Sequence, residues 1–382
     1  MSSQDLMQQM SSSAQDAGSW LEIDAAAFES NVRNLLSMID GRSLLCAVVK
    51  SQAYGHEADL FLPSLVRLGV PFVGVGSNEE AAIARRCGFE GRILRVRAAA
   101  PQEIKAGLRH DIEELAADPQ SAWEMHTIAA EAGKVVRIHL DINSSGIGRH
   151  SLDVSSVLGR ASAVAIVSHP GLRLAGIMTH FPKDDNSHIE TALVRFESQA
   201  LALLQLTGVP REEVPIHCAN SYAALNMRGS WLDMVRAGAF LYGDSEPASG
   251  QFRRCVAFTA RIASINSYAA GTKVGYGLAH TLDRDSRLAS VTAGYGDGYR
   301  GALASQGGVL VRGRRAAIVD VGSMNSMVID VTDIANVSPG DEVVLFGRQG
   351  SAEIAPAELD AANFSNPRGP LHCVGARKPR PR

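Results

Sequence analysis

A lysine stands at the end of an apolar run in the stretch CAVVKSQAYGHE, which covers residues 46–57. Lys50 is followed there by a tyrosine, a glycine and a histidine. An ammonium group at the end of a buried strand loses hydration, which costs free energy unless the charge is paired or the amine is kept neutral for chemistry. The position of Lys50 therefore indicates either a paired charge or an amine that takes part in a reaction.

Other polar side chains follow predicted strands in the same way. Any single one is more easily explained as a polar cap on a strand end than as a catalytic group. The set, however, combines a lysine, two arginines and a histidine with Ser and Gly residues near predicted helix starts, where phosphate groups bind. A lysine beside a phosphate site at one rim of a barrel suggests a pyridoxal phosphate Schiff base. The residues are Lys50, Tyr54, Asn143, Ser145, Arg149, His180, Asn220, Ser221 and Arg236.

Strand-like and helix-like segments alternate through the first two thirds of the chain. Strand–helix alternation predicts a parallel sheet, and about eight units in roughly 200 residues favour a closed (β/α)8 TIM-like barrel over an open sheet. The predicted strands are LLCAVV (44–49), FVGVG (72–76), RILRVR (92–97), VVRIHLDI (135–142), LAGIMTH (174–180), PIHCAN (215–220) and AFLYG (239–243), with IEELAA (112–117) as a weaker candidate.

The pattern changes after Arg253. From there the chain alternates strand-like runs with Gly, Asp and Pro turns and has little helical signal, which predicts a mostly-β C-terminal domain. We therefore expect an α/β barrel followed by a β domain. The predicted boundaries are a disordered tail at 1–18, the barrel at 19–250, the β domain at 251–365, which the N-terminal strand could join, and a basic tail at 366–382.

Composition excludes several classes of protein. The 382 residues are 46% hydrophobic and 20% charged with a net charge of -3, which argues against a nucleic-acid partner. No apolar run approaches the roughly 18 residues that a membrane helix needs. The five cysteines are scattered without a C-x-x-C pair, so we expect no metal site and no disulfide scaffold. Residues 1–18 lack the features of a signal peptide, and we expect a cytoplasmic protein.

Several motifs resemble those of the fold-type III alanine racemases, barrel enzymes that carry pyridoxal phosphate. They are AVVKSQAYGH, IMTHF, HCANSYAAL, MVRAGAFLYGD, KVGYG, GYGDGY and VGSMNSMVIDV, and they occur in family order over about residues 20–360. Within the family the chain is more similar to the broad-specificity amino-acid racemases. The segments that carry this second likeness are LEIDAAAFESNV, GVGSNEEAAIARRCGFEGRILRVR, HLDINSSGIGR, TLDRDSRLASVTAGYGDGYR and SMNS.

The resemblance implies a racemase that interconverts L- and D-amino acids with two proton carriers. Lys50 matches the lysine that forms the Schiff base with pyridoxal phosphate and then serves as a base on one face of the substrate. Desolvation and neighbouring cations would lower the pKa of such a lysine. Tyr276, in KVGYGLAH, matches the acid/base of the opposite face. In this family that tyrosine reaches the site of the partner subunit, so the resemblance implies a homodimer with shared active sites.

The resemblance also implies roles for residues around the cofactor and the substrate. Arg236 would face the pyridine nitrogen. A guanidinium donates a hydrogen bond without giving up its proton, so the ring would stay unprotonated and side reactions such as transamination would be disfavoured. The other matches are Tyr54, Ser221, Gly238 and the backbone of Ala239 for the phosphate, His180 beside the cofactor, Arg149 for the cofactor phenolate or the substrate carboxylate, and Met324 and Asn325 for the substrate.

The chain departs from its relatives at two positions, and from the alanine-selective members alone at a third. Relatives in the broad-specificity group often carry a disulfide in the first barrel units; one partner would be Cys46, but the matching second position is Phe72. The family usually closes with a tyrosine that reaches the phosphate, whereas the last tyrosine here is Tyr299. Alanine-selective enzymes usually have an aspartate where this chain has Asn325. The stretch GYGDGY is expected to be a turn of the β domain, since no helix pattern follows it.

The leading hypothesis is a broad-specificity racemase acting on basic and other unbranched amino acids, alanine and serine. A narrow alanine racemase is the nearest alternative, and Asn325 argues against it. A decarboxylase on a similar barrel would need a Gly-rich phosphate segment and a cysteine motif that are not found here. A non-catalytic cofactor carrier is typically a lone barrel, so the predicted β domain argues against that alternative.

Overall fold

The computed structural model describes residues 16–244, 250–299, 307–319, 322–355 and 358. Most of the predicted tail at 1–18 and all of the basic tail at 366–382 lie outside the described residues. The chain forms two compact units. One unit is Ala26–Arg253, and the other joins the residues up to Ala25 to those from Arg254 onward.

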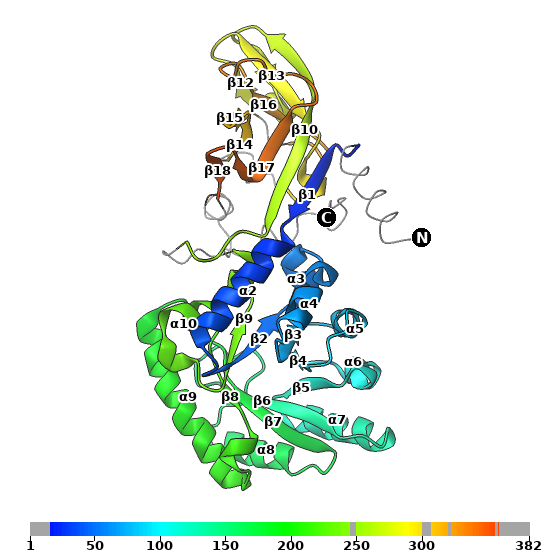
Figure 1. The fold of residues 1–382 in the computed structure, drawn as a ribbon, viewed down its shortest axis with the longest axis vertical. Helices are drawn as coiled ribbons and strands as arrows, with labels where there is room; N and C mark the ends of the chain where they lie inside the picture. The colour runs from blue at the N-terminus through cyan, green and yellow to red at the C-terminus, as the bar shows by residue number, and fades with distance from the viewer. Residues whose placement is uncertain (1–15, 245–249, 300–306, 320–321, 356–357, 359–382) are drawn as a thin grey trace. The chain divides into compact units, whose positions relative to one another are not determined.

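Parallel strands form the centre of the unit Ala26–Arg253 (Figure 1). In its described residues, an 8-stranded sheet has the order β8-β7-β6-β5-β4-β3-β2-β9. Two backbone hydrogen bonds join the ends of this sheet, from Asp233 N–H to the Ile216 carbonyl (3.2 Å) and from Arg236 N–H to the Ala219 carbonyl (3.0 Å). The predicted (β/α)8 barrel is therefore confirmed. Its strands are β2 (Leu44–Val48), β3 (Phe72–Val75), β4 (Arg92–Arg95), β5 (Ile112–Ala116), β6 (Val136–Asp141), β7 (Leu172–Met178), β8 (Ile216–His217) and β9 (Met234–Ala237).

Helices follow the strands and surround them (Figure 1). In α9 (Asn186–Thr207), the residues Ile189, Phe196 and Leu203 are buried at the spacing of one helix face. Asp185 caps the start of α9 by accepting a hydrogen bond from His188 N–H, and Gly208 ends it with a φ of 68°. The other helices are α2 (Ala25–Ile39), α4 (Ala58–Arg67), α5 (Asn78–Arg86), α6 (Pro101–Gly107), α7 (Pro119–Glu131), α8 (Val157–Val167) and α10 (Ser221–Asn226).

The prediction of one barrel strand is wrong. Residues 239–243 (AFLYG) were expected to be the last strand, but Ala239–Tyr242 is a 3-10 helix, and the strand is β9 at Met234–Ala237. All four residues of the 3-10 helix are buried, and a short apolar run buried on every side has no periodicity that separates strand from helix. Arg236 therefore lies within the strand rather than before it. The weaker candidate at 112–117 does form a strand, β5.

The second unit is an antiparallel sheet. Its strand order is β1-β10-β13-β16-β15-β14-β17-β18, with an additional pairing of β10 and β17. The N-terminal strand β1 (Ser19–Ile23) pairs with β10 (Val256–Tyr268), with Leu21 opposite Phe258. The predicted mostly-β domain is thus confirmed. The remaining strands are β13 (Ser286–Val291), β14 (Gly308–Val311), β15 (Arg314–Ile318), β16 (Met327–Asp330), β17 (Glu342–Gln349) and β18 (Ala352–Ile354), with β11 (Lys273–Val274) and β12 (His280–Thr281) as a separate hairpin.

The cysteines of the described residues carry free thiols. Cys46 lies on β2 directly opposite Phe72 on β3. Burial raises the pKa of the Cys46 thiol to about 12, which makes it a packing group rather than a reactive one. The other free thiols are Cys87, Cys218 and Cys255. Among the helices of the described residues, none combines the length and apolarity that crossing a bilayer requires.

Candidate active site

Lys50 begins a left-handed turn at the carboxyl end of β2. This turn, α3 (Lys50–Gly55), contains four consecutive non-glycine residues, Ser51 to Tyr54, with φ between 53° and 59°. The left-handed conformation costs an L-residue about 1–2 kcal/mol. Such strain persists where surrounding structure fixes it, and it is common at functional sites.

Glu80 holds this turn in place. Glu80 is 5% exposed, and its Oε1 accepts a hydrogen bond from Gln52 N–H at 3.1 Å. Its Oε2 accepts from Gly76 N–H at 2.6 Å and from Ser77 N–H at 3.3 Å, in the loop after β3. One carboxylate therefore connects the loops that follow two neighbouring barrel strands. Sequence reasoning missed this residue, although Ser77 and Glu80 have the spacing of a capping box.

Lys50 and Arg149 line the same cavity. Its volume is about 440 Å³, which is large enough for a small organic ligand. The structure therefore brings together the predicted Schiff-base lysine and the predicted substrate arginine, which are far apart in sequence. The lining residues are Lys50, Ser51, Gly76, Ser77, Glu80, Val96, Arg97, Arg149 and His150.

Three predicted phosphate-site residues meet at Gly238. Ser221 Oγ accepts a hydrogen bond from Gly238 N–H at 3.0 Å. A Cβ atom added to Gly238 would lie 2.2 Å from the hydroxyl oxygen of Tyr54, so only glycine fits there. Ala239, the fourth predicted residue, follows directly. The hydroxyl groups of Tyr54 and Ser221 thus converge at Gly238, and two hydroxyl groups close together can donate hydrogen bonds to an anion.

Arg236 is buried, and only one of its three nitrogens has no protein acceptor. Its Nη1 donates to His217 Nδ1 at 2.7 Å, and its Nη2 donates to the Thr179 carbonyl at 2.8 Å. Within the described part of the chain, Nε has no acceptor. Burial lowers the pKa of Arg236, but a guanidinium remains protonated in proteins. Nε is therefore a fixed donor for a ligand atom.

A buried hydrogen-bonded chain extends from Arg236 through the barrel interior. His217 Nε2 lies 2.9 Å from His139 Nδ1, and His139 Nε2 lies 2.7 Å from Glu113 Oε2. Because Arg236 donates to Nδ1 of His217, the proton of the neutral His217 ring must be on Nε2. That proton goes to His139 Nδ1, so the proton of His139 is on Nε2 and faces Glu113. One set of tautomers satisfies every member of this relay, which consists of Arg236, His217, His139 and Glu113.

The charges around the relay are consistent with these tautomers. Burial lowers the pKa of His139 and of His217, which keeps both rings neutral. Desolvation raises the pKa of Glu113, but hydrogen bonds from His139 and Arg92 outweigh it and lower the pKa to about 2. Arg92 and Arg137 both pair with Glu113, at 2.5 and 2.9 Å. Sequence reasoning missed the relay, although a Glu or His inside a predicted buried strand was a signal.

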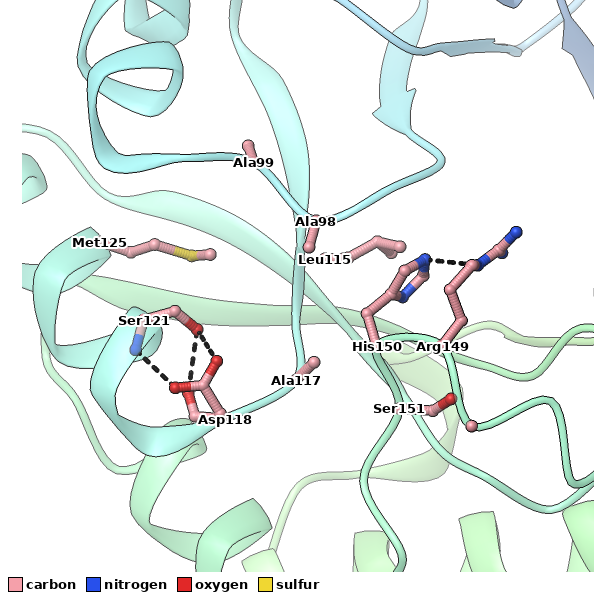
Figure 2. A pocket seen from close by; sticks show the side chains of 11 residues that line it. Ala98, Ala99, Leu115, Ala117, Asp118, Ser121, Met125, Arg149, His150 and Ser151 are labelled. Atoms are coloured by element: carbon pink, nitrogen blue, oxygen red, sulfur yellow. Dashed lines mark hydrogen bonds between the residues drawn. The ribbon is translucent and has the colours of Figure 1, made fainter.

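Two further predicted residues of the barrel unit lie at the ends of β6 and β7. His180 follows β7, and its carbonyl accepts a hydrogen bond from Ser145 Oγ at 2.6 Å. Arg149 is exposed on the loop after β6, and its Nε donates to His150 Nε2 at 3.0 Å (Figure 2). No carboxylate of the described residues lies within ion-pair distance of Arg149, so its two Nη groups remain for a ligand.

The other predicted residues belong to the β unit. Tyr276 lies in a 3-10 turn, Tyr276–Leu278, and is 66% exposed. Met324 is 56% exposed, and its carbonyl accepts a hydrogen bond from Gly296 N–H at 2.7 Å. Asn325 is also exposed. The GYGDGY stretch forms a turn that contains the 3-10 helix Tyr295–Asp297.

Family models match both units. The model described as "Alanine racemase, N-terminal domain" covers residues 23–246, and "Alanine racemase, C-terminal domain" covers residues 255–380. The chain belongs to the alanine racemase family. The two matches together span both the barrel with Lys50 and the β unit with Tyr276.

Individual members of the alanine racemase family are similar over most of their length. A "Broad specificity amino-acid racemase" of Pseudomonas taetrolens is 45% identical over 91% of this chain and 85% of its own. A "Lysine racemase" of Proteus mirabilis is 40% identical over 90% of this chain and 84% of its own. The crystal structure of an alanine racemase from a D-cycloserine-producing Streptomyces lavendulae has a TM-score of 0.85 at 29% identity, covering 95% of this chain and 96% of that one.

Proposed function

We propose that this protein is a pyridoxal phosphate-dependent amino-acid racemase of broad specificity that acts as a homodimer. The observation that carries the proposal is the cavity shared by Lys50 and Arg149, in a chain whose family relatives at 40–45% identity are named as broad-specificity and lysine racemases. A reactive amine and a cation that can bind a carboxylate on one cavity are the groups that amino-acid chemistry on this cofactor requires.

The residues present fit pyridoxal phosphate. The Ser221 and Tyr54 hydroxyls, which both lie against Gly238, suit the phosphate. Arg236 Nε is placed to donate to the pyridine nitrogen, because both of its Nη groups are already engaged. When bound, the cofactor supplies a conjugated ring that withdraws electrons and makes the α-proton of an amino acid acidic.

Lys50 and Tyr276 of the partner subunit move the α-proton on opposite faces of the substrate. A single base tends to return a proton to the face from which it came, so inversion needs a second carrier. Lys50 begins the left-handed turn that Glu80 holds, which fixes the backbone from which its side chain extends. Tyr276 is 66% exposed in a single chain, which leaves its phenol available to a second copy.

Arg236 controls the reaction that follows proton removal. With the cofactor bound, Arg236 would donate a hydrogen bond to the pyridine nitrogen and keep its proton, since a guanidinium does not titrate in this range. The relay to Glu113 prevents Arg236 from rotating away. Charge from the α-carbon is therefore withdrawn only weakly, and return of a proton to that carbon is favoured over side reactions.

Broad specificity is supported by Asn325 and by the relatives. An amide at position 325 leaves the substrate region without the negative charge of an aspartate. We propose that basic and other unbranched amino acids, alanine and serine are substrates. A narrow alanine racemase is the alternative, and a protein named "Alanine racemase" from Desulfovibrio desulfuricans is 31% identical. The cytoplasmic location stays a prediction from the sequence.

Incubation with separate L-amino acids followed by chiral chromatography tests the activity. We expect D-lysine, D-arginine, D-alanine and D-serine to form from their enantiomers. Release of CO2 and an amine without any D-enantiomer would instead show a decarboxylase. Formation of D-alanine alone would instead support a narrow alanine racemase.

Two variants assign the proton carriers. Lys50→Ala should abolish both the yellow absorbance of the Schiff base and the activity. Tyr276→Phe should keep that absorbance and lower the rate by about 10²–10⁴-fold, the usual contribution of a positioned acid/base group. Full activity in Tyr276→Phe would contradict the two-base proposal.

A further inference from the structure

Asp141 is a buried carboxylate whose charge has no hydrogen-bond donor. It ends β6, is 1% exposed, and neither of its oxygens receives a hydrogen bond from the described residues. A buried carboxylate is unfavourable unless another group faces it. Its Oδ2 lies 2.9 Å from Nδ1 of His150, whose side chain is 13% exposed, although the contact lacks the geometry of a hydrogen bond. His150 is therefore the side chain that faces the Asp141 carboxylate.

The other ring nitrogen of His150 contacts Arg149. His150 Nε2 lies 3.0 Å from Arg149 Nε (Figure 2). Because Arg149 Nε always carries a hydrogen, His150 Nε2 must be the acceptor. The proton of the neutral His150 ring is then on Nδ1, the atom next to the Asp141 carboxylate. Asp141, His150 and Arg149 thus form a chain of contacts. Arg149 Nε donates to His150 Nε2, and His150 Nδ1 faces the carboxylate of Asp141.

Arg149 stands between two cavities. It lines the 440 Å³ cavity with Lys50 and also a second cavity of about 360 Å³. Asp118, Ser121 and Met125 lie on the opposite side of the second cavity from Arg149 and His150 (Figure 2). A long side chain with room on both sides populates more than one orientation unless contacts favour one of them.

We propose that Asp141 and His150 are positioning residues that hold Arg149 towards the carboxylate of the amino-acid substrate. The carboxylate of Asp141 keeps the His150 ring in the Nδ1–H tautomer, and His150 Nε2 fixes Arg149 Nε. The two Nη groups of Arg149 are left for a bidentate contact with the substrate carboxylate. This inference rests on the proposed function, since it requires an amino acid in the cavity with Lys50.

Asp141 also balances the positive charge of this region. Burial lowers the pKa of Arg236, Asp141 acts in the opposite direction, and Arg149 adds to the lowering. The carboxylate is therefore close enough to Arg236 to oppose the lowering of its pKa. Replacing it with a neutral isostere should affect Arg149 through the tautomer of His150 while leaving the hydrogen bonds of Arg236 in place.

The kinetic test is Asp141→Asn in the cofactor-loaded enzyme. We expect kcat/KM for L-alanine and for L-lysine to fall by the same factor, about 10- to 100-fold, mainly through KM. The factors should be equal because both substrates share the carboxylate and differ only in the side chain. Cofactor content should be unchanged. Asp153→Asn is the matched control, because Asp153 is exposed on the loop after β6 and its side chain accepts hydrogen bonds from Ser155.

A double-mutant cycle shows whether Asp141 acts through Arg149. Arg149→Lys removes the Nε donor, so adding Asp141→Asn to this variant should change kcat/KM less than twofold. A further loss as large as that of Asp141→Asn alone would overturn the proposal. His150→Ala, at a partly exposed position, should reproduce the loss of Asp141→Asn and serves if the aspartate variant does not fold.

A spectroscopic test does not depend on activity. ¹⁵N NMR of histidine-labelled protein should show the Nδ1–H tautomer for His150, identified by the signals that His150→Ala lacks. This tautomer should be lost in Asp141→Asn. An Nε2–H tautomer in the wild-type protein would overturn the proposal. If the wild type shows the expected tautomer but racemises no amino acid, the proposed function fails while the contact between Asp141 and His150 stands.

Discussion

The proton positions in the barrel interior are set by individual residues. Arg236 cannot accept a proton and Glu113 cannot donate one, so the two histidines between them have a single consistent tautomer each. The relay therefore has a fixed direction, with donors facing away from Arg236. The relay immobilises the Arg236 guanidinium, which we propose as the contact to the pyridine nitrogen of the cofactor.

Glu113→Gln tests the relay through stability. The carboxylate is buried and its pKa is lowered to about 2, so its contribution is fully present above pH 4.5 and is lost as the pH falls towards 2. We expect Glu113→Gln to lower the free energy of unfolding by about 3 kcal/mol at pH 7, because removing one partner leaves buried groups uncompensated. Urea unfolding at pH 7, 4 and 3 should show the difference from wild type shrinking below pH 4.5.

A surface carboxylate provides the control for this prediction. The pKa of Glu29 is also lowered to about 2, by hydrogen bonds from Arg67 and then Arg33. Both arginine partners are exposed, so Glu29→Gln should cost about 1 kcal/mol or less. Equal losses of unfolding free energy for Glu29→Gln and Glu113→Gln would show that burial of the relay adds nothing to stability.

Single residues were predicted from sequence where their position within a motif was distinctive. Lys50, Arg149 and Gly238 stand at strand ends or tight turns, and the structure places the first two on one cavity. Glu113, His139 and His217 were missed because a polar residue inside a strand can face the barrel interior or the helices. The sequence does not distinguish these two orientations, because they differ only in which residues the side chain contacts in the folded barrel.

At the level of secondary structure, the left-handed turn α3 decides where Lys50 lies. The turn has no glycine at its four positive-φ positions, so nothing in its composition distinguishes it from an ordinary helix start. The barrel strands were predicted well because β-branched runs between turn residues are a strong signal. The 3-10 helix Ala239–Tyr242 was mistaken for a strand since its residues are buried on all sides.

Glycine substitutions of two exposed serines should change the free energy of unfolding in opposite directions. Ser51 has a φ of 55°, so Ser51→Gly removes steric strain and should raise the free energy of unfolding by about 1 kcal/mol. Ser198 lies exposed within α9, where Ser198→Gly should lower it by about 0.5 kcal/mol. Urea denaturation of both variants measures the two signs. A loss of stability in Ser51→Gly equal to that in Ser198→Gly would show that the turn carries no strain.

For the whole molecule, the proposed shared active site would make activity a property of the dimer. In that proposal each complete site takes Lys50 from one chain and Tyr276 from the other. Mixtures of two inactive variants can therefore regain activity, because a symmetric dimer has two equivalent sites.

Lys50→Ala and Tyr276→Phe should complement each other. After the two proteins are unfolded together and refolded, random pairing should restore about a quarter of the wild-type sites, one in each mixed dimer. The measurement is racemisation of L-alanine by the mixture, with each variant refolded alone as the control. No recovery in a mixture that sizes as a dimer would show that both groups of a site come from one chain.

The pairing of β1 with β10 affects how the chain is made on the ribosome. Ile23 is opposite Val256, so the first strand leaves the exit tunnel long before its partner has been translated. At the usual rate of about 5–20 residues per second, the interval is on the order of 10–50 s. The barrel unit is synthesised during that time, and β1 stays without its partner strand, open to a chaperone or a neighbouring nascent chain.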